Sequence, residues 1–178
     1  MIAGTRITAL NETELTRFRR SRVGFVFQSY NLLPGLTVRE NIELPARLSG
    51  TRLDRAWVRS VSERIGLADR LKHRPAQLSG GQQQRVAIAR ALVSRPDVIF
   101  ADEPTGALDT TSGREVLELL TECVRSDGMT VVMVSHDPTA AAYAESVLFL
   151  ADGRLVGRLT DPTADLIAAQ MLMIGARR

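Results

Sequence analysis

Three short apolar runs constrain the fold of this chain more than any other feature of its sequence. They are Val23–Phe27, Val98–Ala101 and Thr130–Val134, and each is nearly continuous rather than alternating with polar residues. A continuous apolar run of this length is typical of a parallel strand that is covered on both faces. Helical patterns lie between the runs, as in Arg114–Val124, where the apolar residues form one stripe. Strand alternating with helix predicts an α/β fold with a mostly parallel sheet.

Two features stand near the end of the chain. A fourth apolar run, Val147–Leu150, is separated from Arg154–Leu159 by Asp152-Gly153, and this spacing predicts an antiparallel hairpin. The segment from Pro162 to Arg178 carries several apolar residues. We expect it to form a C-terminal helix that packs on the core.

Residues from about Tyr30 to Pro75, within a predicted subdomain of residues 29–91, differ in character from the rest of the chain. They are polar, rich in Arg and helix-prone, with breaks such as Pro34-Gly35. We expect them to form a mostly helical subdomain inserted into an α/β core, which would comprise residues 1–28 and 92–178.

The charge and the cysteine content exclude several classes of protein. The 178 residues carry a formal net charge of +3, and the basic residues do not gather in a block. We interpret this charge as a dispersed, solvated surface rather than a nucleic-acid footprint. No apolar run approaches the roughly 18 residues of a membrane-spanning helix. The single cysteine, Cys123, cannot form an internal disulfide, and the composition suits a reducing cytoplasm.

A Ser-Gly-Gly-Gln sequence opens one of the predicted helices. Ser79 can cap this helix, and Gln82, three residues later, completes a capping box. Gly80 and Gly81 let the backbone N–H groups approach a ligand closely, and N–H groups at a helix N-terminus bind anions, most naturally phosphate. Taken alone, the pattern is more typical of an ordinary capped helix that follows a glycine turn.

Polar side chains follow each of the three strand-like runs. Asp102 and Glu103 come at the end of the second run, where α/β sheets bind ligands. Asp102 can hold Mg²⁺, and Glu103 can polarise a water for attack on a phosphoryl group. Gln28 follows the first run and can reach a metal-bound or attacking water. His136 follows the third and can contact a terminal phosphate.

In this order, the motifs resemble those of the nucleotide-binding domains of ATP-binding cassette (ABC) proteins, with a P-loop NTPase-like fold. The similar elements are the Q-loop at Phe27-Gln28, the signature motif and its helix at 78–92, the Walker B strand at 98–103, the D-loop at 106–109 and the switch histidine at His136. Residues 23–34 and 102–109 are most similar to the lipoprotein-release and macrolide-export subfamily. The resemblance covers nearly all of the chain.

The resemblance implies a mechanism for a complete domain. Two ATPase domains would pair head to tail around two ATP molecules, with Ser79, Gly80, Gly81 and Gln82 of one domain at the γ-phosphate bound to the other. Asp109 would contact the partner domain.

The resemblance also implies roles for the polar residues at the ends of the strands. Asp102, assisted by Gln28, would hold Mg²⁺, and Glu103 would act as the general base. His136 would stabilise the transferring phosphate, and Gln28 would link the site to the helical subdomain.

The resemblance implies a membrane partner as well. Tyr30–Leu44 and neighbouring helices would form a groove for the coupling helix of an integral membrane permease. We therefore expect an ATP-binding subunit that is cytoplasmic and peripheral on the inner face of the cell membrane. It would couple ATP hydrolysis to export or envelope transport, with no nucleic acid as partner.

One part of the family pattern has no match. A phosphate loop of the form G-x-x-x-x-G-K-[ST] should precede Gln28, but the only lysine, Lys72, follows Leu71. That loop supplies most of the β- and γ-phosphate binding. The first strands and the aromatic residue that stacks on adenine are also missing. We therefore expect residues 1–178 to be a partial ABC ATPase domain, either recorded from a late start or a catalytically incompetent remnant.

Two other interpretations of the function of this chain stay open. A non-transport ABC ATPase acting on nucleic acid or the ribosome is disfavoured, because the short separation of Gln28 and Ser79 suits a transporter's compact helical subdomain. A catalytically dead interaction module is disfavoured mildly, because Glu103 and His136 are intact.

Overall fold

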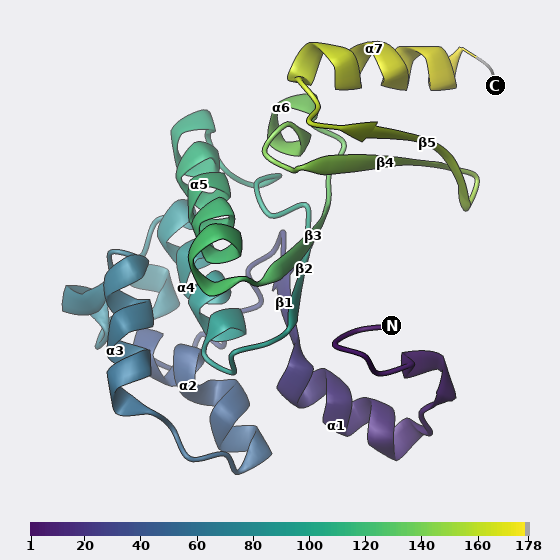
Figure 1. Ribbon diagram of the computed structural model, residues 1–178. Coiled ribbons are helices and arrows are strands. Elements are labelled where there is room, and N and C mark those ends of the chain that lie inside the picture. Colours follow the sequence, from purple (N-terminus) through teal and green to yellow (C-terminus); the bar gives the residue numbers. More distant parts are fainter. Residues whose placement is uncertain (177–178) are drawn as a thin grey trace. The chain divides into compact units, whose positions relative to one another are not determined.

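Three parallel strands organise the first of two units in the computed structural model (Figure 1). The units are Met1–Val134 and Ser135–Arg178, of which the structure describes residues 1–176. The strands are β1 (Val23–Phe27), β2 (Val98–Asp102) and β3 (Thr130–Val134), in the spatial order β1-β2-β3. This arrangement confirms the predicted parallel sheet.

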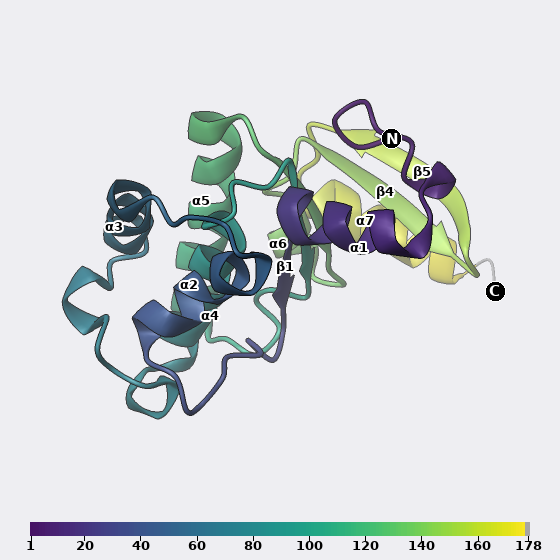
Figure 2. The same ribbon diagram turned by 90° about the horizontal axis from the view of Figure 1, so that it is seen from below.

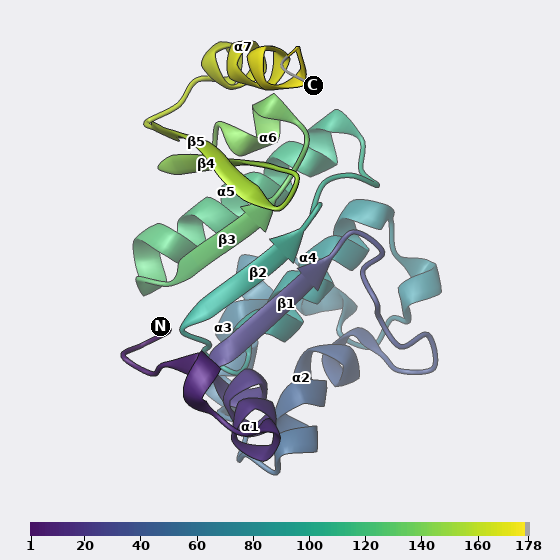
Figure 3. The same ribbon diagram turned by 90° about the vertical axis from the view of Figure 1, so that its right-hand side faces the viewer.

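The register of the sheet brings the three carboxyl ends level. Phe27 pairs with Asp102, and Asp102 pairs with Val134, so that the strands end side by side at one edge (Figure 3). The residues that follow each strand therefore emerge next to those that follow its neighbour.

Helices cover one face of this sheet. They are α2 (Val38–Ser49), α3 (Arg55–Arg64), α4 (Gly80–Leu92) and α5 (Thr110–Asp127), and all lie on the same side of the strands (Figures 1 and 2). Helix α1 (Glu12–Arg22) leads directly into β1. Three short 3-10 turns complete the unit, at Ile7–Ala9, Ala68–Arg70 and Pro75–Gln77.

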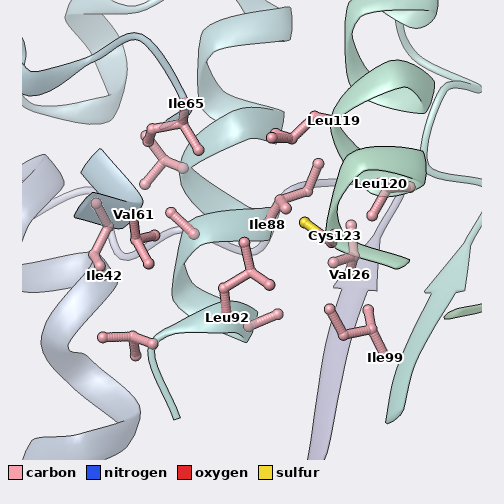
Figure 4. Close-up of a cluster of buried hydrophobic side chains, with 14 of the residues drawn as sticks. Val26, Ile42, Val61, Ile65, Ile88, Leu92, Ile99, Leu119, Leu120 and Cys123 are labelled. Atoms are coloured by element: carbon pink, nitrogen blue, oxygen red, sulfur yellow. The ribbon is translucent and has the colours of Figure 1, made fainter. Parts of the chain in front are cut away.

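The hydrophobic core lies between α4 and its neighbours. Ile88 and Leu92 of α4 are fully buried, and so are Val26 and Ile99 of the sheet; Figure 4 shows this cluster with Cys123 of α5 beside it. Gly24 allows α4 to approach β1 closely, since a Cβ at this position would lie 3.1 Å from the Cβ of Ala91.

The opposite face of the sheet differs from the prediction. The apolar runs predict strands covered on both faces, but Phe25 is 42% exposed and Phe100 is 37% exposed. These rings stack with centroids 6.0 Å apart. The prediction is wrong here because side chains alternate along each strand, and the helices α2–α5 cover only the face that carries Val26 and Ile99.

The local signals for helix ends are confirmed. Ser79 and Gln82 form the predicted capping box at the start of α4, and Thr37 with Glu40 forms another at α2. Every element between β1 and β2 in the structure is a helix. The division into a core of residues 1–28 and 92–178 and a subdomain of residues 29–91 stays a prediction.

The second unit contains the predicted hairpin. Its elements are α6 (Pro138–Ala141), β4 (Ser146–Ala151), β5 (Arg154–Thr160) and α7 (Ala164–Gly175). Strands β4 and β5 pair antiparallel, and α7 packs on α6 and β4 through the buried Ile167. The predicted C-terminal helix is thus confirmed, but the packing contacts of α7 lie within its own unit and not on the core cluster of the first unit. Residues 177–178 of that prediction lie outside the described residues. Among residues 1–176, no helix combines the length and apolarity that crossing a membrane requires.

Candidate functional site

The candidate site lies at the carboxyl edge of the sheet. Gln28 follows β1 and Glu103 follows β2, and the paired strand ends place them next to each other. The two side chains meet at Gly106: a Cβ on this glycine would lie 2.8 Å from Nε2 of Gln28 and 3.4 Å from Oε2 of Glu103. The structure therefore brings together an amide and a carboxylate that the sequence predicts as site residues.

The backbone of Glu103 is held in an unusual conformation. Its φ of +47° lies in the left-handed region, which costs a non-glycine residue about 1–3 kcal/mol and occurs most often at functional sites. Its N–H donates to the carbonyl of Val134 at 2.9 Å, and its carbonyl accepts from the N–H of Gly106 at 3.0 Å. The end of β3 and the following turn thus fix the direction in which the carboxylate leaves the sheet.

The carboxylate of Asp102 is exposed at the same edge. Among the described residues, no three His, Cys, Asp or Glu side chains gather as a metal site. This donor set nevertheless fits Mg²⁺, because Mg²⁺ in phosphate-binding sites keeps several waters and takes only one or two carboxylates besides phosphate oxygens. Asp102 and the amide oxygen of Gln28 are the oxygen donors at this edge that the sequence predicts for Mg²⁺, beside the Glu103 carboxylate that it predicts as the general base.

The Ser-Gly-Gly-Gln motif forms the N-terminus of α4. The hydroxyl of Ser79 accepts from the N–H of Gln82 at 3.3 Å, and Oε1 of Gln82 accepts from the N–H of Ser79 at 3.0 Å. The amide donors at this helix start make an anion-binding end.

Both glycines of the motif are also required by packing. A Cβ on Gly80 would lie 2.7 Å from the hydroxyl oxygen of Tyr30, and one on Gly81 would lie 2.8 Å from Cβ of Ser112. From the sequence, these glycines indicate either ligand approach or an ordinary capped helix, and neither interpretation includes these packing contacts. Tyr30 and Ser112 come from distant segments, so no local pattern could reveal these contacts.

Asp109 is the N-cap of α5. Its carboxylate accepts from the N–H groups of Thr111 at 3.1 Å and Ser112 at 3.0 Å. The pKa of this carboxyl is lowered, chiefly by the hydrogen bond from the backbone of Ser112. Asp109 therefore stays ionised and fixes the start of α5 in this chain, and a contact with a partner domain stays a prediction.

His136 belongs to the second unit. It follows β3 by two positions and precedes Asp137, the N-cap of α6. Its imidazole is exposed. The role predicted for His136 stays a prediction.

Two residues of α4 that were not predicted as site residues hold the main chain on either side of Gln28. Gln84 is fully buried, and its Nε2 donates to the carbonyls of Phe27 at 3.2 Å and Pro104 at 2.7 Å. Arg90 donates to the carbonyls of Tyr30 and Asn31, and burial lowers the pKa of its guanidinium. The signal that could have found Gln84 is its position on the buried stripe of α4, where a polar side chain needs internal partners.

Comparison with known proteins gives consistent matches. The family model described as ABC transporter matches residues 2–106. The macrolide export ATP-binding/permease protein MacB of Marinobacter nauticus is 51% identical over 170 residues, which are 94% of this chain and 26% of that protein. MacB of Rhodopseudomonas palustris (strain HaA2) is 53% identical over 166 residues, 92% of this chain and 25% of that protein. The chain thus spans about a quarter of the length of these relatives.

Solved structures show the same fold. The ATP-binding cassette MJ0796, in a dimeric post-hydrolysis state bound to ADP and Pi, has a TM-score of 0.76 and 41% identity, covering 90% of this chain and 72% of that one. The cbiO1 protein from Clostridium perfringens, part of the ABC transporter complex cbiONQ, has a TM-score of 0.77 and 27% identity, covering 93% of this chain and 66% of that one.

Proposed function

We propose that this chain, which belongs to the ABC transporter family as part of its ATP-binding domain, hydrolyses ATP to drive an exporter. The observation that carries this proposal is the meeting of Gln28 and Glu103 at Gly106, beside Asp102. A carboxylate and an amide at the carboxyl edge of a parallel sheet are suited to phosphoryl chemistry, which depends mainly on positioning and charge.

The chemistry follows from the side chains at this edge. Glu103 accepts a proton from a water at its carboxylate and orients that water for attack, a contribution of about 10²–10⁴-fold in rate for general bases. Gln28 orients the same water through its amide. Asp102 and Gln28 would hold Mg²⁺. The Mg²⁺–ATP complex, when bound, supplies the phosphoanhydride bond that is hydrolysed, and its Mg²⁺ neutralises the charge of the phosphate groups.

Phosphate binding requires more than these residues. The chain contains no G-x-x-x-x-G-K-[ST] sequence, so the proposed function needs a phosphate loop from outside the 178 residues. The proposal is therefore made for the assembly in which this chain works.

A second ATPase domain is part of the proposed assembly. The start of α4, with Ser79, Gly80, Gly81 and Gln82, would bind the γ-phosphate held by that second domain, and Asp109 would lie at the contact between the two. Support comes from the helix-terminal N–H groups and from the dimeric state of the similar cassette MJ0796.

A membrane permease is the other proposed partner. The relatives are named as joint ATP-binding and permease proteins. In this chain, Leu33 is 46% exposed and Leu48 is 69% exposed. Asn41, fully buried at the start of α2, orders the loop that carries Leu33 by bonding its N–H and its carbonyl. We place the permease contact on this helical surface, and we propose that the chain lies on the cytoplasmic side of the membrane.

The test is ATP hydrolysis by the full-length protein with Mg²⁺. Phosphate release is measured for the wild type, for Glu103→Gln and for Glu118→Gln, an exposed carboxylate on α5 that serves as the matched control. We expect Glu103→Gln to lower the rate by about 10²-fold or more, as loss of a general base does, and Glu118→Gln to leave it unchanged. Equal rates for Glu103→Gln and the wild type, or a folded wild type that hydrolyses nothing, would contradict the proposal.

A further inference from the structure

We propose that Gln84 is a positioning residue for hydrolysis, because it ties together the main chain beside Gln28 and the main chain beside Glu103. This inference rests on the proposed function. Gln84 hydrogen-bonds to the backbone beside Gln28 and beside Glu103. It would therefore act on these two side chains through the backbone and not by direct contact.

The geometry of the Gln84 amide carries the inference. Phe27 directly precedes Gln28 and Pro104 directly follows Glu103, and Nε2 of Gln84 donates to the carbonyls of both, at 3.2 and 2.7 Å. A primary amide has two N–H protons, so the two bonds use its full capacity to donate. One side chain on α4 thereby spans the gap between the residue before Gln28 and the residue after Glu103.

The orientation of this amide is fixed by its acceptors. Two carbonyl oxygens face the same end of the side chain, and only the NH₂ end can satisfy them. The other end, Oε1, is buried and has no hydrogen-bond partner among the described residues. A flipped amide would place this oxygen against two carbonyl oxygens, so the observed orientation is the one that the surroundings select.

Glu103 has a backbone conformation that needs such support. Its backbone lies in the left-handed region, and strained conformations persist only where the surrounding structure over-determines them. The carbonyl of Val134 and the N–H of Gly106 hold it from one side. Gln84 holds the next residue, Pro104, from the side of α4.

The same helix also holds the loop after Gln28. Arg90 donates to the carbonyls of Tyr30 and Asn31, both of which have positive φ values. Gln84 and Arg90 thus tie α4 to the main chain at two points, at the end of β1 before Gln28 and in the loop after it. Because α4 begins at the Ser-Gly-Gly-Gln motif, a shift of that motif would be transmitted to Gln28 and Glu103 through these two side chains.

The test replaces the amide without changing the length of the side chain. Gln84→Met removes the two donors, and in the full-length protein we expect kcat to fall by about 10–100-fold, because small displacements of catalytic groups reduce rates by such factors. The dissociation constant of ATP should change by less than about 3-fold, since a positioning role leaves ground-state binding intact. The matched control is Ile88→Val, which removes one buried methylene from the same helix and should leave kcat unchanged.

A double-mutant cycle separates positioning from loss of stability. In the background of Gln28→Ala, Gln84→Met should lower kcat by much less than it does alone, because part of its effect passes through Gln28. The same fold-loss in both backgrounds would overturn the inference, and so would a wild-type kcat for Gln84→Met. Should Gln84→Met fail to fold, Gln84→Asn, which retains the amide but shortens it, is measured by the same criteria.

The outcomes distinguish this inference from the proposed function. If the wild type and Glu103→Gln hydrolyse ATP equally, the proposed function fails and this inference fails with it. If Glu103→Gln is inactive while Gln84→Met retains the wild-type kcat, only the inference about Gln84 is overturned.

Discussion

The side-chain amide of Gln28 lies against the backbone of Gly106, where an added Cβ would be 2.8 Å from Nε2 of Gln28. The nearest atom is the end of a flexible side chain, which can move aside. Gly106 is therefore a position at which the site can be disturbed while the fold is left intact.

Gly106→Ala should separate activity from stability. We expect the free energy of unfolding to change by less than about 1 kcal/mol, because the clash is relieved by rotation of Gln28. The rate of ATP hydrolysis should fall about 10-fold or more, because the displaced amide no longer orients water. Urea unfolding and phosphate release measure the two quantities, and full activity in this variant would remove Gln28 from the site.

Gly80 and Tyr30 should show compensation. Gly80→Ala places a Cβ 2.7 Å from the hydroxyl oxygen of Tyr30, and overpacking of this kind costs about 1–3 kcal/mol. In Tyr30→Phe the hydroxyl is gone, and the nearest ring atom, Cζ, lies at 3.7 Å. Gly80→Ala should therefore destabilise the wild type but not Tyr30→Phe. An equal loss in both backgrounds, measured by urea unfolding, would show that the close contact does not limit packing.

Gly24 should be intolerant of any side chain. A Cβ there would lie 3.1 Å from Cβ of Ala91 and 3.2 Å from Cγ1 of Ile99, inside a well-packed layer between α4 and the sheet. Gly24→Ala should lower the free energy of unfolding by about 1–3 kcal/mol. Gly35→Ala is the matched control, because a Cβ on Gly35 meets nothing within 4 Å. If Gly35→Ala lowers the free energy of unfolding as much as Gly24→Ala does, the clash at Gly24 is not the cause of the loss.

Cys123 should make stability depend on alkaline pH. Burial raises the pKa of its thiol to about 11 from an ordinary value near 9, although Arg64 opposes this shift. Between these values the unfolded chain has released a proton that the folded chain retains, so the free energy of unfolding falls as the pH rises. The loss should be on the order of 2–3 kcal/mol across that window.

The control for this prediction is Cys123→Val, which fills a similar volume and carries no proton. Its free energy of unfolding should depend less on pH between 9 and 11 than that of the wild type, because the thiol is absent. The same slope in both proteins would show that other groups cause the dependence.

The elements that the sequence predicted well are those specified by local patterns. The runs at Val23–Phe27 and Thr130–Val134 are strands of one parallel sheet, and Ser79 with Gln82 caps α4 as the spacing indicates. The Asp152-Gly153 hairpin is confirmed for the same reason. Turn and cap chemistry acts over a few residues, so it can be recognised without knowledge of the packing.

What the sequence could not predict depends on contacts between distant segments. Gln84 stands in a Gln-rich stretch, and although its position on the buried stripe of α4 indicates burial, only the packing of α4 against two strand ends shows which carbonyls it bonds. The exposed face of the sheet is a similar case: Phe25 and Phe100 indicate burial by their type, but exposure depends on which elements cover that face.

The most direct test of the central claim is the identity of the nucleotide that the protein retains. The full-length protein is incubated with Mg²⁺ and ATP, separated from free nucleotide, and its bound nucleotide is analysed for the wild type and Glu103→Gln. We expect ADP on the wild type and unhydrolysed ATP on Glu103→Gln. ADP on both proteins, or no bound nucleotide on either, would contradict the claim that this edge of the sheet is a site of ATP hydrolysis.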